Sequence, residues 1–194
     1  LVQSDLSFTS GYSPYALDFD GTGDKITLNS AIQLSTNKSV SVWVFVNTSL
    51  QQNCLLGGTD YTQEQYFWLN APSQKVYLRD YTSGAATQLD TGVLTNNWTH
   101  FCVTGDGTTA TMYVNGTQTD TGADKILGLR AIGGFTSSTS YFFNGKASNI
   151  SIWNATLTSS QVTEIYNEGV PSNLNNHSAY SNLVSWWQLG SNSS

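Results

Sequence analysis

The sequence contains few charged residues, and they are scattered. Asp, Glu, Lys and Arg make up 10% of the 194 residues, against about 25% in an average globular protein. The five Lys and two Arg occur singly, in a chain of formal net charge -6. Without a basic stripe, the chain lacks the charges that neutralise phosphates or anionic lipid headgroups. We therefore expect no nucleic-acid partner and no membrane-surface partner.

Long apolar runs and cysteines are scarce as well. The longest uninterrupted apolar run is Val42–Val46, far shorter than the ~20 residues that cross a bilayer, so we expect no membrane insertion. Cys54 and Cys102 are the only cysteines, and their spacing matches neither a zinc-binding pair nor a redox C-x-x-C motif. The sequence leaves open whether the two form a disulfide or remain two buried thiols.

Hydroxyl, amide and glycine residues are abundant instead. Ser, Thr, Asn and Gly total 83 of 194 residues, while 39% hydrophobic and 12% aromatic residues provide material for a core. Short β-branched and aromatic runs recur between Gly, Asn, Asp and Thr clusters, which is typical of an antiparallel sandwich or barrel. The predicted strands are 16–19, 25–28, 39–47, 54–57, 65–70, 75–80, 87–89, 98–104, 110–114, 131–134, 145–153 and 183–189.

Alternation within two of these strands indicates which side faces the core. The four valines of residues 39–47 fall on one side, which we expect to be buried, and Trp43 falls on the other. Residues 145–153 repeat this pattern, with Trp153 opposite two isoleucines. Both Trp rings need a second cover from a crossing loop or a third small sheet, unless they form part of a partly open concave surface.

Local signals predict one helix and two hairpin turns. A capping box that begins at Thr158 predicts a short helix near residues 158–168, which stops at Gly169. Residues 104–107 and the dipeptide Asn115-Gly116 separate strand patterns and predict tight hairpin ends.

Short motifs follow one another over most of the chain. They are Leu17-Asp18-Phe19-Asp20-Gly21 with Asp24-Lys25-Ile26, Ser39-Val40-Ser41-Val42-Trp43, Trp98-Thr99-His100-Phe101, Met112-Tyr113-Val114-Asn115-Gly116, Phe143-Asn144-Gly145-Lys146 through Ile152-Trp153-Asn154, and Leu157 with Ile165-Tyr166-Asn167-Glu168-Gly169. In this order they resemble the laminin-G-like, concanavalin A-like lectin/glucanase jelly-roll superfamily. Residues 183–190 are also similar to segments of marine phage structural proteins.

The resemblance implies an all-β fold, a two-sheet antiparallel jelly-roll sandwich with one short helix. Members of this superfamily bind glycans or proteins, or serve as adhesion and assembly modules. We expect residues 1–194 to form a single laminin-G-like domain. Because the chain starts at Leu1 without a charged and then apolar leader, we expect it to be an excerpt or processed part of a longer chain.

Residues of known catalytic chemistry do not form an enzyme-like pattern. A glycosidase needs two carboxylates about 5 to 9.5 Å apart, and the glucanase relatives carry alternating acids on one strand. No predicted strand here does so, and the only glutamates are Glu64, Glu164 and Glu168. His100 stands beside a strand Trp in a position that the family fills with a structural His. We therefore expect a protein that is not an enzyme and requires no cofactor.

Calcium is the ion that best matches the acidic residues. Asp18, Asp20 and Asp24 surround a Gly-rich turn that offers carboxylate and carbonyl oxygens, and we expect Asp20 and Asp24 to be the ligands of a structural Ca²⁺. The alternative is a solvated turn. Many relatives place acids after the Gly-Lys segment, where this chain has Ser148 and Asn149.

Aromatic rings flanked by amides and acids are typical of glycan sites. Tyr66 and Trp68 alternate onto one face of their strand, Tyr77 lies on the next, and Trp187 is near the end of the last. These four rings are the predicted ligand-binding residues. Most rings in such a sandwich belong to the core, so only the fold can select among them.

These observations predict a noncatalytic recognition or assembly module on a virion or an extracellular surface. Its expected partners are a glycan or protein on a cell or virion surface, identical copies of itself, or other structural proteins. The alternative is a carbohydrate-binding appendage of a secreted polysaccharide-degrading enzyme.

Overall fold

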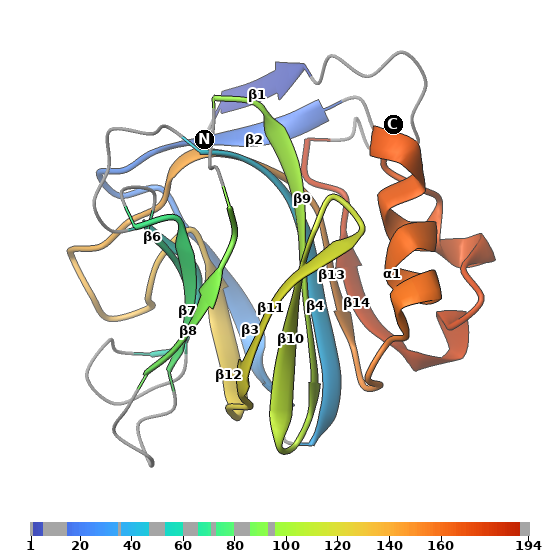
Figure 1. The fold of residues 1–194 in the computed structure, drawn as a ribbon. Coiled ribbons are helices and arrows are strands. Elements are labelled where there is room, and N and C mark those ends of the chain that lie inside the picture. The colour runs from blue at the N-terminus through green and yellow to red at the C-terminus, as the bar shows by residue number, and fades with distance from the viewer. Residues whose placement is uncertain are drawn as a thin grey trace.

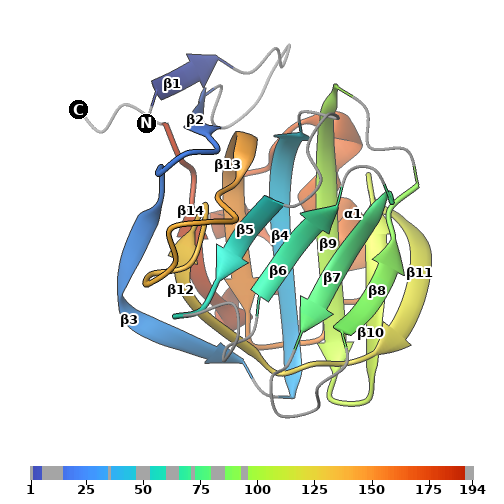
Figure 2. The ribbon, with the colours of Figure 1, turned by 90° about the vertical axis from the view of Figure 1, so that its left-hand side faces the viewer.

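The computed structural model of the protein is a sandwich of two antiparallel sheets with a helix against one of them (Figure 1). It describes residues 2–5, 15–34, 36–46, 53–59, 66–70, 73–79, 86–92 and 96–190. Figure 2 shows the six-stranded sheet in front, the eight-stranded sheet behind it, and helix α1 on the far side. The expected all-β jelly-roll architecture is confirmed.

The eight-stranded sheet has the order β1-β2-β13-β4-β9-β10-β11, and β14 also pairs with β13. Its strands are β1 (Val2–Asp5), β2 (Tyr15–Asp20), β4 (Asn37–Val46), β9 (Trp98–Asp106), β10 (Thr109–Val114), β11 (Thr117–Ala123), β13 (Asn144–Trp153) and β14 (Leu183–Trp187). The long central strands β4, β9 and β13 carry most of the buried positions of this sheet.

The six-stranded sheet has the order β3-β12-β5-β6-β7-β8. Its strands are β3 (Ile26–Leu34), β5 (Asn53–Gly57), β6 (Tyr66–Asn70), β7 (Lys75–Arg79), β8 (Ala86–Asp90) and β12 (Leu127–Ile132). The remaining elements follow β13 and are α1 (Ser159–Tyr166), η2 (Asn167–Gly169), η3 (Leu174–Asn176) and η4 (Tyr180–Asn182).

Every predicted strand overlaps an observed one, although the predicted segment 131–134 shares only its first two residues with β12. The prediction missed β1 and β11. Strand β11 reads TQTDTGA and is mostly exposed. Its threonines recur at every second position, but it lacks the alternation of apolar and polar residues that identifies a half-buried strand. Its pairing with β10 and its contacts with β8 stabilise it instead.

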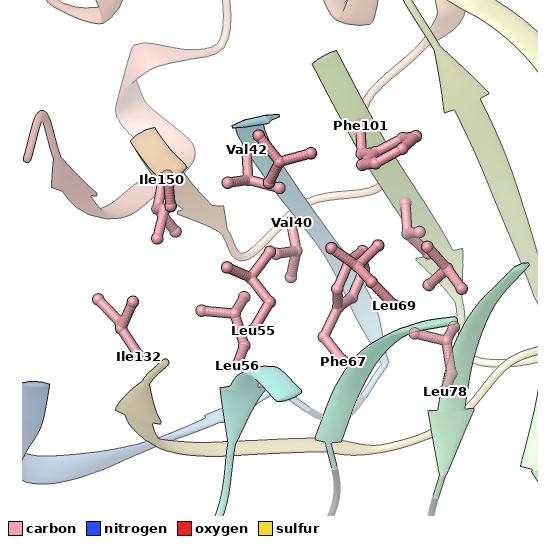
Figure 3. Packing of buried hydrophobic residues seen from close by; sticks show 14 of the residues in the cluster. Val40, Val42, Leu55, Leu56, Phe67, Leu69, Leu78, Phe101, Ile132 and Ile150 are labelled. Carbon is pink, nitrogen blue, oxygen red and sulfur yellow. The ribbon is translucent and has the colours of Figure 1, made fainter. Parts of the chain in front are cut away.

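The core lies between the two sheets and follows from side-chain alternation. The four valines of β4 are all buried in it, as predicted. Figure 3 shows Val42 and Phe101 of the eight-stranded sheet opposite Phe67 and Leu69 of the six-stranded sheet. Each fully buried side chain of this kind contributes roughly 1.5–3 kcal/mol of transfer free energy.

The outer sides of Trp43 and Trp153 are covered by the chain that follows β13. Trp43 is 2% exposed and Trp153 is 0% exposed. Tyr166 of α1 stacks on Trp43 with centroids 5.8 Å apart, and His177 packs on Trp153 at 4.7 Å. The cover is therefore a helix with its C-terminal segment, and the open concave surface considered for these rings is wrong.

Two of the three predicted local motifs are where the sequence puts them, whereas the hairpin end predicted at residues 104–107 is at Gly107 and Thr108, because β9 continues to Asp106. The side chain of Thr158 accepts a hydrogen bond from the Gln161 N–H and the Gln161 side chain accepts one from the Thr158 N–H, which is the expected capping box. The helix ends at Tyr166, before the predicted stop at Gly169, because Asn167 adopts the left-handed conformation. Asn115 and Gly116 have φ values of 50° and 77°, as the type I′ turn between β10 and β11 requires.

Cys54 and Cys102 are free, buried thiols. Cys54 pairs with Trp68 on the outer side of the six-stranded sheet, whereas Cys102 packs with Trp153 on the outer side of the eight-stranded sheet. Packed sheets are about 10 Å apart, and a disulfide needs Cα atoms within about 7 Å. The structure therefore contradicts the disulfide and agrees with the alternative of two buried thiols.

Candidate functional site

Strand register gathers aromatic and polar side chains on the outer face of the six-stranded sheet. Cys54, Trp68, Tyr77 and Gln88 are direct partners across β5, β6, β7 and β8. The residues on either side of Trp68 and Tyr77 in sequence are buried in the central core. Because successive side chains point to opposite faces, this row lies on the outside of the sandwich. We call Trp68, Tyr77, Gln88 and the neighbouring Tyr141 the aromatic row.

Exposure increases along the row from β5 to β8. Cys54 is 0% exposed and Trp68 is 9% exposed, Tyr77 is half-buried and Gln88 is exposed. The ring of Trp68 is therefore the least accessible ring of the row, at its β5 end. Tyr77 offers the accessible aromatic surface, and Gln88 adds an amide that both donates and accepts hydrogen bonds.

Tyr141 reaches the row from the connection between β12 and β13. Its ring lies 5.2 Å from that of Trp68 and is tilted by 47°. Its φ is 65°, a left-handed conformation that costs a non-glycine residue about 1–3 kcal/mol and is enriched at ligand sites. The Cys54 N–H donates to the Tyr141 carbonyl at 3.2 Å, which anchors the connection to β5 and holds the ring in place.

Lys25 fixes the same connection from its other side. Its ammonium donates to the carbonyls of Phe135 and Thr136, both at 2.9 Å. It also lies 5.6 Å from the centroid of the Phe142 ring, within the range of a cation–π interaction. These contacts hold the connection that carries Tyr141 in a fixed position beside the outer face of the six-stranded sheet.

Polar side chains flank the aromatic row. On one side Asn70, Lys75 and Asp90 are register partners, and Lys75 and Asp90 form an ion pair. The hydrogen bond to Asp90 raises the pKa of Lys75 above its usual value. On the other side Arg79 pairs with Tyr66. An aromatic surface between hydrogen-bonding rows suits a flat ligand with many hydroxyl groups, because its apolar face stacks and its edges hydrogen-bond.

The fold brings together two of the four predicted ligand-binding rings. Trp68 and Tyr77 are direct partners, and Tyr66 is placed one row away, with its side chain outside the described part. Trp187 lies elsewhere: it pairs with Ile150 in the eight-stranded sheet and packs against the central core. It is half-buried there, away from the other three rings, and its ligand-binding role stays a prediction.

Sequence reasoning missed Tyr141 and Gln88. Tyr141 follows the polar run TSSTS, which predicts a loop but not the strand beside which that loop lies. Gln88 lies between Thr87 and Leu89, which are buried. This alternation predicts that the Gln88 side chain is on the outer face of its strand. Its partner across the sheet is Tyr77, and this depends on register, which alternation alone does not determine.

The Asp20–Asp24 turn is closed by its own hydrogen bonds. The Asp20 carboxylate accepts from the N–H and the hydroxyl of Thr22 at 2.7 and 2.8 Å, which lowers its pKa. Asp24 accepts from the Asp20 N–H at 3.3 Å, and Asp18 pairs with Lys146. The described residues contain no group of three or more His, Cys, Asp or Glu arranged to hold a metal ion. These carboxylates alone do not fit a calcium cage of six to eight oxygens, and calcium binding at this turn stays a prediction.

His100 and Ser41 form a pair that resembles a catalytic one, with His100 Nε2 2.7 Å from Ser41 Oγ. Both are 0% exposed. Tyr166 stacks over the imidazole, and burial lowers the pKa of His100 to about 3. A substrate cannot reach this pair, which fits the structural role predicted for His100.

The fold and this face together define a lectin-type β-sandwich. The family model of the concanavalin A-like lectin/glucanases superfamily matches residues 20–163, about three quarters of the chain. The chain therefore belongs to this superfamily. A comparison with curated protein sequences finds no match.

Solved structures with the same fold include proteins whose names describe binding. A "putative carbohydrate binding protein" from Bacteroides ovatus has a TM-score of 0.63 at 17% identity, over 89% of this chain and 50% of that one. The chain thus spans about half the length of that protein. The Ruminococcus gnavus sialidase module CBM40, bound to α2,3-sialyllactose, has a TM-score of 0.60 at 11% identity, over 85% and 98%. The heptameric pentraxin of Limulus polyphemus has a TM-score of 0.59 at 14% identity, over 90% and 91%.

In the described part of the chain, no helix has the length and apolar character needed to cross a membrane. At 11 to 17% identity these structural matches establish the fold of the chain but not its ligand.

Proposed function

We propose that the protein is a noncatalytic recognition module that binds a glycan on the aromatic row. The observation that carries this proposal is the register that places Trp68, Tyr77 and Gln88 side by side, with Tyr141 held against Trp68. A sugar ring stacked on Tyr77 would have Gln88 within the same row and the Lys75–Asp90 pair in the next. Structures of the same fold named for carbohydrate binding support this reading.

A noncatalytic role is supported by the distribution of the acids. The described glutamates, Glu164 and Glu168, lie on α1 and η2, which cover the opposite sheet (Figure 2). Asp90, beside the aromatic row, is paired with Lys75. A glycosidase needs two carboxylates that face the same sugar. The described acid next to Asp90 is Asp120 of β11, whose Oδ2 accepts from the Asp90 N–H. Asp18 and Asp20 alternate on β2, but they belong to the other sheet, and Asp18 is paired with Lys146.

Glycan binding on this face is tested with the Tyr77→Ala variant. We expect the wild type to bind a subset of polysaccharides on a glycan array, and Tyr77→Ala to weaken that binding roughly tenfold or more, a loss of about 1.4 kcal/mol. Isothermal titration with the best array ligand measures the change.

Tyr180→Ala is the matched control, because Tyr180 is 51% exposed on η4 and lies away from the six-stranded sheet. It should bind like the wild type. Equal losses in both variants, or no ligand on the array, would contradict the proposal.

The surface on which the module works is part of the same proposal. We place it on a virion, as in a phage decoration or fibre protein, or on another extracellular surface, and the alternative is an appendage of a secreted polysaccharide-degrading enzyme. Neighbouring tail or capsid segments in the reading frame would support the virion. A catalytic domain with a secretion leader would support the appendage.

Assembly with identical copies is a second candidate function, and strand β3 favours it. Among the described strands, β3 ends the six-stranded sheet. Its sequence ITLNSAIQL carries no charge, and five of its nine residues are exposed. Edge strands are normally protected by Lys, Pro or bulges. Strand β3 has neither Lys nor Pro, although its pairing with β12 is irregular between Thr27 and Ile32, and an uncharged edge favours pairing with another chain.

A further inference from the structure

A second row of partners crosses the outer face of the other sheet. Asp18, Lys146, Phe45 and Trp98 are consecutive register partners on β2, β13, β4 and β9. Tyr166 covers the row that contains Trp43, whereas Phe45 and Trp98 are only half-buried. A depression of about 270 Å³ lies along this row, lined by Asp18, Phe45, Asn96, Asn144, Gly145 and Lys146.

Phe45 supplies the apolar wall of the depression, and Trp98 supports it from behind. Their ring centroids are 6.0 Å apart at an interplanar angle of 63°, an edge-to-face geometry that orients one ring against the other. Packing against Trp98 therefore fixes the orientation of the Phe45 ring. Because the ring is already ordered before a ligand binds, the entropic cost of binding is lower.

The rim of the depression is polar and its charges cancel. Lys146 Nζ lies 2.8 Å from Asp18 Oδ2, and the two side chains are 30% and 39% exposed. Asn144 donates from Nδ2 to the Asp20 carbonyl at 3.1 Å, which positions its amide, and Asn96 is exposed. An ion pair without net charge, together with two amides, favours a neutral ligand that both donates and accepts hydrogen bonds. The hydrogen bonds between its hydroxyls and the two charged side chains would be stronger than those to the amides.

Gly145 lines the depression with backbone alone, because it has no side chain. Its φ is 147°, and a Cβ at this position would lie 2.4 Å from the Phe45 carbonyl oxygen. Only glycine allows the backbone of β13 to lie so close to β4 there. The volume is below the ~300–1,000 Å³ of pockets for drug-sized ligands, which limits the occupant to a small group.

We propose that this depression is a second carbohydrate-binding subsite, which takes one neutral sugar unit with its apolar face on Phe45 and its hydroxyls on Asn96, Asn144 and the Lys146–Asp18 pair. It lies on the opposite sheet from the aromatic row and is independent of it. Two sites on opposite faces allow one molecule to bridge two glycan chains, which raises avidity without new contacts.

The test is a two-dimensional ¹H–¹⁵N NMR titration with the methyl glycosides of glucose, galactose, mannose and N-acetylglucosamine. We expect at least one glycoside to shift the Trp98 indole signal, the Gly145 amide and the side-chain amides of Asn96 and Asn144. The affinity read from these signals should fall at least fivefold in Phe45→Leu, which removes the ring, and in Lys146→Met, which removes the charge. The spectra themselves report whether each variant is folded.

Two further variants separate this site from the aromatic row. Tyr77→Ala should leave the shifts of the depression intact, and Tyr180→Ala should leave both faces intact. Shifts confined to Trp68, Tyr77 and Tyr141 would overturn the second subsite while supporting the first. Shifts at the depression that persist equally in Phe45→Leu and Lys146→Met would also overturn it. Silence at the depression with all four glycosides would overturn the second subsite, whereas the glycan array decides the proposal for the aromatic row.

Discussion

His100 lies within an aromatic stack beneath α1. Its ring is 5.2 Å from Trp43 and 5.9 Å from Tyr166, and Nε2 is 2.7 Å from Ser41 Oγ. Nδ1 is buried without a hydrogen-bond partner. Burial disfavours the charged imidazolium and lowers the pKa of His100 to about 3, so the folded protein holds this residue neutral.

This burial predicts a pH dependence of stability with a definite sign. Between the unfolded pKa of about 6.5 and the folded value of about 3, the unfolded chain binds a proton at His100 that the folded chain does not. The free energy of unfolding should therefore fall as pH decreases below 6.5, by up to about 1.4 kcal/mol per pH unit from this group. Urea unfolding at pH 7, 6 and 5 measures the slope.

The control for this prediction is His100→Gln, which keeps a neutral polar side chain and every other titratable group. The difference between wild type and variant isolates His100, and the window above pH 5 avoids the titration of Asp20, Asp106 and Glu164, whose pKa values hydrogen bonds lower. Identical slopes in the two proteins would contradict the prediction, because they would show that His100 binds its proton over the same pH range in the folded and unfolded states.

At the scale of elements, the short helix α1 depends on its cap and its packing. Eight residues are too few for a stable isolated helix, and Val162 and Ile165 supply the buried face that docks on the eight-stranded sheet. The capping box satisfies two backbone donors that the first turn leaves unpaired.

Removal of this cap should destabilise the protein measurably. We expect Thr158→Ala to lower the free energy of unfolding by about 1 kcal/mol, measured by urea unfolding at pH 7. Thr163→Ala replaces an exposed threonine inside the same helix and should change stability by less than about 0.5 kcal/mol. Equal effects in the two variants would show that the cap contributes nothing specific.

At the scale of the whole molecule, the two sheets are joined along one side of the sandwich, and on the other side β3 is the last of the described strands of its sheet. On the joined side β8 and β11 are connected by side-chain bonds, such as that from Thr87 Oγ1 to the Ala123 carbonyl at 2.6 Å and that from the Asp90 N–H to Asp120 Oδ2 at 2.8 Å. Contacts between copies are therefore expected along β3.

This expectation is tested by sedimentation velocity over a range of protein concentrations. The wild type should associate, and Ala31→Lys, which places a charge on the exposed edge of β3, should remain monomeric because a charged edge resists strand pairing. Asn175→Lys adds the same charge on exposed η3 and should associate like the wild type. A strictly monomeric wild type would remove the assembly function and leave glycan binding untouched.

Residue patterns could predict a large part of the fold. The alternation in β4, the capping box at Thr158 and the Asn115–Gly116 turn each depend on residues within a few positions of one another. Such local preferences act before distant segments meet, and they agree with the final structure here. The polar strand β11 was missed because tertiary pairing overrides its weak local preference.

The sequence by itself determined most of the extended segments and which of their faces is apolar, and it predicts that charge-driven partners are excluded. Only the tertiary structure decided which rows meet: Trp68 beside Tyr77 and Tyr141, Trp187 against the core, and the two cysteines on opposite faces. The reason is that strand register and the position of a connection depend on the packing of the whole sandwich, since a shift of one residue moves every side chain of a strand to the other face.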